Sequence, residues 1–101
     1  MLFRSFNYKA DKITDMKDNL DVLIYTTKDC SYCKKAKLIF KKFKIKYNEI
    51  IIKDELDRIE MSRLSNGKKT VPQIFIKNKH IGGYDDLNYL KKSGKLDKFL
   101  N

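Results

Sequence analysis

The stretch VLIYTTKDCSYCKKAK, residues 22–37, holds both cysteines of the chain. Its first five residues form a run of branched and aromatic side chains, which predicts a buried strand over residues 22–26. Cys30 and Cys33 follow after a short connection. The cysteine pair is therefore expected just beyond the end of a strand.

The residues after the cysteines predict a helix. Ala36, Ile39, Phe40 and Phe43 recur at the spacing of one helix face, while lysines occupy the other faces. Asp29 stands just ahead and is the expected N-terminal cap of this helix. Cys30 is thus expected in or next to the first helical turn.

The rest of the chain repeats these signals. Consecutive isoleucines predict that the second strand is buried on both faces. Glycines and an SNG stretch end the later helices and strands. We expect strands over 47–52, 73–76 and 80–81, helices over 54–64 and from Asp85–Asp86 to about 92, and a last amphipathic turn over 96–100.

The expected order is β-α-β-α-β-β-α. The first βαβ unit requires parallel strands with a right-handed crossover, whereas the last two strands are joined too closely for a crossover and must be antiparallel. The fold class is therefore α/β, a mixed four-stranded sheet flanked by helices. A C-x-x-C pair beside a βαβ unit is typical of the thioredoxin fold.

The chain is expected to be a single domain over residues 1–101, with its core at about 20–100. An extra N-terminal helix is predicted from the spacing of Ala10, Ile13, Lys17 and Leu20. Residues 1–8 have no predicted element.

Composition narrows the class of function. No apolar run approaches the roughly 18 residues of a membrane span, and residues 1–6 lack the apolar core of a secretory signal. We therefore expect a cytoplasmic protein. The net charge of +10 is spread over every segment without a nucleic-acid-binding motif, so an anionic small substrate is a better match than DNA or RNA.

Two cysteines also restrict the chemistry. A structural zinc site needs four ligands, and one C-x-x-C with the single His80 cannot supply them. A disulfide across so short a loop removes little entropy from the unfolded chain. Redox chemistry remains. Free N–H groups and the partial positive charge of a helix start stabilise a thiolate, so Cys30 is the expected nucleophile and Cys33 is placed to resolve its mixed disulfide.

Two further motifs predict a ligand site. Pro72, in KKTVPQIF, opens a strand and leaves the backbone of Val71 free to pair with an extended ligand. In HIGGYDDL, Gly82 and Gly83 permit close approach of a ligand, and the aspartates cap a helix whose N–H groups bind a carboxylate. A carboxylate next to that anion site would bind an ammonium group. Together the motifs predict a site for a zwitterion such as the amino-acid end of a peptide.

Over about residues 20–100, these three motifs together resemble the dithiol glutaredoxins, whose bacterial type shows TVPQIFI and GG-x-DDL. The resemblance implies a thioredoxin fold, glutathione as cosubstrate, and attack by Cys30 with resolution by Cys33. It implies a cis Pro72 and binding of the γ-glutamyl end by the GGYDDL segment. The implied glutathione-binding residues are Lys28, Tyr32, Arg58, Thr70, Val71, Pro72, Gly83, Tyr84, Asp85 and Asp86.

The implied partners are glutathione, disulfide-containing or glutathionylated proteins and, indirectly, the glutathione reductase and NADPH system, with a monomer as the expected state. A thioredoxin is disfavoured because the chain has no tryptophan. The glutaredoxin-like class that serves ribonucleotide reductase is disfavoured by the presence of the GG-x-DDL motif.

The chain departs from the family pattern at two positions. Thr27 stands where a lysine is usual, and Lys28 follows it; Lys68 and Lys69 are alternative partners for the glycine carboxylate. Ser31 replaces the common proline of C-P-Y-C. Some glutaredoxins with CSYC bridge a [2Fe–2S] cluster across a dimer with two glutathiones, and a cluster carrier or sensor with Cys30 as ligand is therefore the alternative function.

Overall fold

The computed structural model describes residues 21–100, which form one mixed sheet with helices on both faces. The sheet order is β2-β1-β3-β4, and β1 pairs in parallel with β2 and antiparallel with β3, which pairs antiparallel with β4. This arrangement confirms the predicted fold. The strands are β1 (Val22–Thr26), β2 (Tyr47–Ile51), β3 (Gln73–Ile76) and β4 (Lys79–Gly82).

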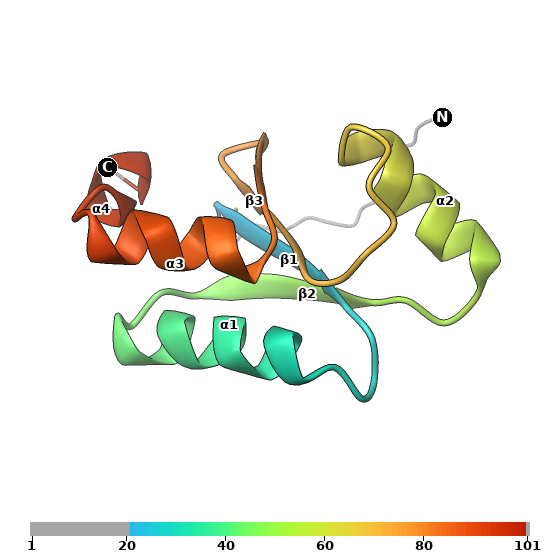
Figure 1. Cartoon of the computed structure of the whole chain (residues 1–101), viewed down its shortest axis with the longest axis horizontal. Coiled ribbons are helices and arrows are strands. Elements are labelled where there is room, and N and C mark those ends of the chain that lie inside the picture. Colours follow the sequence, from blue (N-terminus) through green and yellow to red (C-terminus); the bar gives the residue numbers. More distant parts are fainter. Residues whose placement is uncertain (1–20, 101) are drawn as a thin grey trace.

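The helices divide between the two faces of the sheet. Figure 1 shows α1 and α3 lying side by side, with α2 apart from them at the other end of the molecule. Among the described helices, none is long and apolar enough to cross a membrane. The helices are α1 (Ser31–Lys42), α2 (Glu55–Leu64), α3 (Tyr84–Lys92) and α4 (Leu96–Leu100).

Alternation along the strands produces two cores. Ile24 of β1 and Ile74 of β3 face α1, α3 and α4, where they pack with Phe40 and Leu87 in the larger cluster. Tyr25 and Phe75, the next residue along each strand, point to the other face and pack with Met61 of α2. Because successive side chains of a strand point to opposite faces, the five residues of β1 contribute side chains to both cores.

Two local expectations are wrong. The N-cap of α1 is Cys30 rather than Asp29, because the helix starts at Ser31 and the Cys30 sulfur accepts the N–H of Cys33. The second strand is not buried on both faces: Ile50 and Ile51 are 38% and 48% exposed, since β2 lies at the edge of the sheet. Phe43, at the end of the predicted apolar stripe, is the C-cap and is also partly exposed.

Other expectations agree with the structure or fall outside it. The Val71–Pro72 peptide bond is cis, as the resemblance implies. The last two strands form a two-residue hairpin at Lys77 and Asn78, both with positive φ, which is the conformation of the tight turns that match the strand twist. The predicted N-terminal helix lies outside the described residues.

Candidate active site

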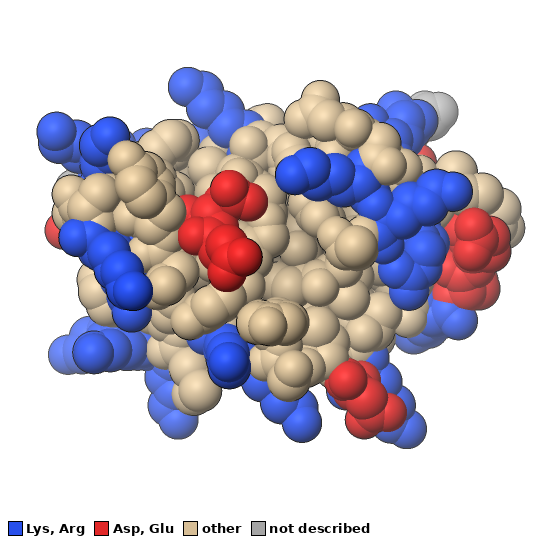
Figure 2. Space-filling model, in the orientation of Figure 1, with Lys and Arg blue, Asp and Glu red and all other residues tan. Residues whose placement is uncertain are grey.

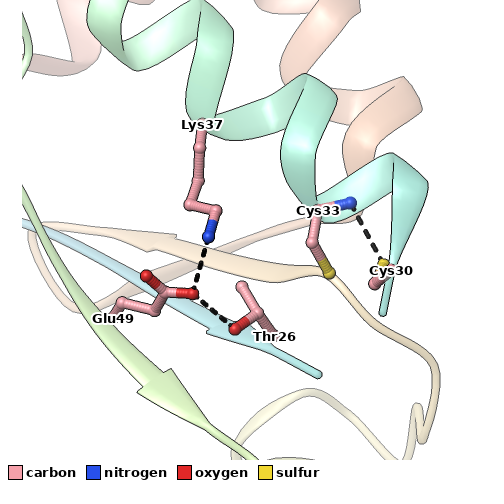
Figure 3. A network of polar contacts seen from close by, with 5 residues as sticks. All are labelled: Thr26, Cys30, Cys33, Lys37 and Glu49. Carbon is pink, nitrogen blue, oxygen red and sulfur yellow. Dashed lines mark hydrogen bonds and ion pairs between the residues drawn. The ribbon is translucent and has the colours of Figure 1, made fainter. Parts of the chain in front are cut away.

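The two cysteines occupy the start of α1 with different environments. Cys30 is the N-cap and partly exposed, whereas Cys33, one turn later, is only 1% exposed. The backbone N–H of Cys33 donates to the Cys30 sulfur over 3.1 Å, as Figure 3 shows. An N–H aimed at a sulfur stabilises negative charge on it. The geometry therefore presents Cys30 as the accessible nucleophile and keeps Cys33 beneath it.

Burial also separates the chemistry of the two thiols. It is the main reason that the pKa of the Cys33 thiol is raised to about 12, with a further contribution from its hydrogen bond to Cys30. A thiol with so high a pKa is protonated near neutrality and unreactive, since the thiolate is the nucleophile. Cys33 is therefore inert until a partner on Cys30 brings a disulfide sulfur to it.

Selective alkylation tests this difference. We expect iodoacetamide at pH 7 to modify Cys30 and leave Cys33 unmodified in the folded protein, because Cys33 is both buried and protonated. In denaturant both cysteines of the chain should react, which is the control for reagent competence. Peptide mass spectrometry after digestion reads out each site. Equal labelling of the two thiols in the folded state would contradict the assignment.

A partly buried polar network lies between α1 and the strands, on the side to which the Cys33 side chain points (Figure 3). The carboxylate of Glu49 accepts hydrogen bonds from the Thr26 hydroxyl over 2.6 Å and from the Lys37 ammonium over 2.9 Å. Partial burial opposes ionisation of Glu49, but these two donors outweigh it and lower its pKa; the same contact raises the pKa of Lys37. The network ties α1 to β1 and β2.

The Glu49 network predicts an acid-sensitive contribution to stability. A carboxyl group whose pKa is lower in the folded than in the unfolded state stabilises the fold. The contribution is fully present at pH values above the unfolded pKa, near 4.5 for glutamate, and is lost as the pH falls through the pKa of the folded state. We expect Glu49→Gln to lower the melting temperature more at pH 7 than at pH 3. Because the pair is partly exposed, the loss should be about 1 kcal/mol or less. An equal loss at both pH values would contradict this origin.

A cavity of about 300 Å³ lies next to the cysteine pair. Val71, which lines it, has its carbonyl oxygen 3.8 Å from the Cys30 sulfur. The other walls come from the helix that follows Cys30, the loop before β3 and the start of α3. The lining residues are Tyr32, Lys68, Thr70, Val71, Pro72, Gln73, Gly83, Tyr84, Asp85 and Asp86.

Charges of opposite sign face each other across this cavity. Asp85 and Asp86 stand at the start of α3, and Lys68 lines the cavity from the loop before β3. Figure 2 shows an acidic patch over the start of α3 and basic side chains around the loop before β3, with an uncharged surface between them. A ligand that carries both an ammonium and a carboxylate group would match this separation.

The start of α3 is built from a glycine pair. Gly83 is the N-cap, and its N–H donates to the Asp86 carboxylate over 3.0 Å. Gly82 has a φ of +122°, and a Cβ at this position would overlap the Asp86 carboxylate. Gly82 is therefore favoured by its backbone angle, and a side chain there would displace the Asp86 carboxylate, whereas Gly83, with a φ of −93°, has an ordinary conformation.

Aromatic side chains form the rim between α1 and α3. The Tyr32 and Tyr84 rings lie 5.8 Å apart between centroids, and the Lys35 ammonium lies 5.1 Å and 5.9 Å from the two rings. Such cation–ring contacts are worth about 0.5–1 kcal/mol at exposed sites. The rim places a positive charge and two apolar ring surfaces beside the cysteine pair.

The structure brings together most, but not all, of the predicted binding residues. Every predicted glutathione-binding residue except Lys28 and Arg58 lines the cavity. Lys28 is exposed in the connection before α1, and Arg58 donates to the Lys69 carbonyl over 2.6 Å, so it ties α2 to the loop before β3. Lys68 is the basic residue that lines the cavity. Gln73 also lines it and was missed, although its position next to Pro72 was a usable signal.

A family model described as glutaredoxin matches residues 22–81 of the chain, a span that contains the cysteine pair and the cis-proline segment. The chain belongs to the glutaredoxin family. It is 46% identical over 81 residues to glutaredoxin 1 of Rickettsia prowazekii, covering 78% of this chain and 85% of the relative. It is 45% identical over 82 residues to a glutaredoxin of Pseudomonas aeruginosa, covering 79% and 95%.

Solved glutaredoxin structures share the fold. The solution structure from Brucella melitensis is 43% identical with a TM-score of 0.71 and covers 80% of this chain and 88% of its own. The buckwheat glutaredoxin–glutathione complex is 30% identical with a TM-score of 0.72 and covers 79% and 76%. With its family, fold and cysteine pair in agreement, the chain is a thiol–disulfide oxidoreductase.

The alternative of a bridging [2Fe–2S] cluster concerns the assembled protein. Such a cluster takes four thiolate ligands, and one chain offers a single accessible thiol, Cys30. The cluster would therefore need a second chain and external thiols. This alternative stays a prediction, for which absorption spectra and gel filtration of anaerobically prepared protein are the measurements.

Proposed function

We propose that this oxidoreductase uses glutathione as its cosubstrate. It reduces glutathione mixed disulfides through Cys30, and protein disulfides through Cys30 and Cys33 together. The observation that carries the proposal is the charged cavity beside Cys30, whose lining includes the acidic start of α3, Lys68 and Val71. Glutathione carries an ammonium and a carboxylate at one end and a second carboxylate at the other, with the sulfur between them.

Each part of the cavity has a partner in the tripeptide. The N–H groups at the start of α3 suit the γ-glutamyl carboxylate, and Asp85 or Asp86 suits the neighbouring ammonium. The backbone of Val71 suits the cysteinyl part, because within the described residues its N–H makes no backbone hydrogen bond. Lys68, rather than Lys28 or Arg58, suits the glycine carboxylate. This assignment orients the glutathione sulfur toward Cys30.

The one-cysteine reaction proceeds by two exchanges. The Cys30 thiolate attacks the glutathione sulfur of a mixed disulfide, forming a Cys30–glutathione disulfide, and the released thiolate of the substrate takes up a proton. A second glutathione thiolate then attacks the glutathione sulfur of this adduct. It forms glutathione disulfide and returns Cys30 as a thiolate. Cys33 takes no part in this route.

The two-cysteine reaction uses the buried thiol. Cys30 attacks a protein disulfide and forms a mixed disulfide with one of its sulfurs, while the other leaves as a thiolate. Cys33 gives its proton to the thiolate released in the first exchange and attacks the Cys30 sulfur, which releases the second protein thiolate and leaves a Cys30–Cys33 disulfide. Glutathione reduces this disulfide. We propose a cytoplasmic monomer, with glutathione disulfide recycled by glutathione reductase and NADPH.

Substrates that differ only in the glutathionyl group test the proposal. The mixed disulfide of cysteamine with glutathione and the symmetric disulfide of cysteamine share a leaving thiol, but only the first carries the tripeptide. We expect turnover of the first, coupled to NADPH oxidation by glutathione reductase, to be at least about tenfold faster, which corresponds to about 1.4 kcal/mol of selective binding. Equal rates would refute a glutathione site.

A further inference from the structure

A line of four polar side chains connects the loop after α2 with the cavity. The Asn66 amide is 3.1 Å from Nδ1 of His80, whose Nε2 is 2.6 Å from Oε1 of Gln73. Nε2 of Gln73 then donates to the carbonyl oxygen of Thr70 over 3.0 Å and to its hydroxyl over 3.3 Å. Thr70 and Gln73 line the cavity, whereas His80 and Asn66 do not.

The hydrogen bonds fix the direction of donation along this line. The amide nitrogen of Gln73 faces the Thr70 carbonyl, so the amide oxygen of Gln73 faces His80 and must accept a hydrogen bond from it. Nε2 of His80 therefore carries the proton. Nδ1 of a neutral imidazole then accepts from the Asn66 amide. Burial and, to a lesser extent, the charge of Lys68 lower the pKa of His80, which agrees with this neutral tautomer. Asn66, His80 and Gln73 each donate to the next member, with Thr70 as the last acceptor, an arrangement in which hydrogen bonds strengthen one another.

The hairpin places His80 at this point. Phe75 is opposite His80 in the pairing of β3 with β4, and their rings lie 5.1 Å apart between centroids. Gln73, two residues before Phe75, has its side chain on the same face of the sheet and is the diagonal neighbour of His80. Gln73 is 1% exposed, so its amide depends on protein partners. Without His80, its oxygen would be buried and unpaired.

We propose that His80 is a positioning residue for the glutathione site: through Gln73 it holds the Thr70–Val71–Pro72 segment where the backbone of Val71 can pair with the tripeptide. The inference rests on the proposed function. It goes beyond it because His80 itself lies outside the cavity. Its substitution should weaken the glutathione adduct on Cys30 without touching either cysteine.

Two substitutions separate the donor from the ring. His80→Phe keeps a ring against Phe75 but has no N–H for Gln73, whereas His80→Gln keeps an amide donor near the position of Nε2. Asn66→Gly removes the outermost hydrogen bond at an exposed position whose φ of +57° glycine adopts without strain. Ser93→Ala is the matched control, because it removes a side-chain hydrogen bond to the Leu90 carbonyl at the far end of α3.

The measurement is the equilibrium between the protein and glutathione disulfide in a Cys33→Ser background, where no second thiol can release the adduct. The Cys30 sulfur bonds to one glutathione sulfur, the disulfide of the reagent breaks, and the other glutathione leaves as a thiolate that takes the proton of Cys30. Intact-mass spectrometry at fixed ratios of glutathione to glutathione disulfide gives the equilibrium constant. Circular dichroism verifies that each variant is folded.

We expect His80→Phe to lower this constant by about tenfold, because the adduct then forms only from the fraction of molecules in which the Thr70–Val71–Pro72 segment is still in place. His80→Gln and Ser93→Ala should stay close to the parent, and Asn66→Gly should show a smaller decrease. The inference is overturned if His80→Phe matches the parent, or if Ser93→Ala falls as far as His80→Phe. If instead the Cys33→Ser parent forms the adduct no more favourably than free cysteine, the proposed glutathione site itself fails, whatever His80 does.

Discussion

Cys30→Ser is expected to abolish every thiol–disulfide reaction of this protein, whereas Cys33→Ser should keep the reduction of glutathione mixed disulfides and lose the reduction of protein disulfides. Cys30 is the only thiol within reach of a substrate, because Cys33 is 1% exposed and its pKa is raised to about 12. A serine hydroxyl at position 30 cannot replace the thiolate, since it is not ionised near neutrality. The one-cysteine route, in contrast, needs no second thiol.

Two assays on the same preparations measure this division. The glutathione–cysteamine mixed disulfide reports the first route, and reduction of insulin, followed by its precipitation, reports the second. Wild type should be active in both assays, Cys33→Ser in the first only, and Cys30→Ser in neither. If the two variants lost activity equally in the first assay, the assignment of roles to the two cysteines would be wrong.

Gly82→Ala is expected to destabilise the fold and to remove most glutathione-dependent activity. The residue has a φ of +122°, and a Cβ would lie 2.7 Å from Cγ of Asp86 and overlap its carboxylate. A non-glycine residue in a sparsely populated backbone region costs about 1–3 kcal/mol. In addition, the displaced carboxylate would lose its hydrogen bond from Gly83 and leave the wall of the cavity. Chemical denaturation and the mixed-disulfide assay measure the two effects.

The chain contains a matched control for the backbone angle alone. Gly94 has a φ of +76°, but a Cβ there would meet nothing within 4 Å. Gly94→Ala should therefore lose stability without losing activity at temperatures where it is folded. If Gly94→Ala and Gly82→Ala lowered activity to the same degree, the effect would be one of stability, and the contact with Asp86 would be irrelevant to the site.

The fold followed from local signals that tertiary contacts did not override. The apolar run 22–26, the helical spacing from Ala36 to Phe40 and the short link between the last strands were sufficient to predict the order of the elements along the chain, the parallel first pair of strands and the antiparallel last pair. The exposure of Ile50 and Ile51 was not predictable in this way. Whether an apolar strand is central or at an edge depends on the order of strands in the sheet, and isoleucines are favoured in both positions.

The site was predictable where one motif supplies several wall residues. The segments around Pro72 and Asp85 each supply several consecutive residues of the cavity wall. Once the fold was predicted, both segments could be placed beside Cys30 without knowing the direction of any single side chain. Lys28 and Arg58 depend instead on where a long side chain points, and Arg58 is used by the Lys69 carbonyl. The role of His80 could not be predicted from the sequence, because its contact with Gln73 exists only once the hairpin has formed.

The burial of Cys33 beneath Cys30 also imposes an order of events. An oxidant or a disulfide in solution cannot react first with Cys33, because Cys33 is buried next to Cys30. Cys33 can react only with a disulfide that Cys30 has already formed. Reaction at Cys30 therefore always precedes reaction at Cys33. Burial also protects Cys33 from irreversible oxidation, to which exposed and ionised thiols are the most susceptible. An irreversible oxidant should therefore inactivate this enzyme by attack at a single sulfur.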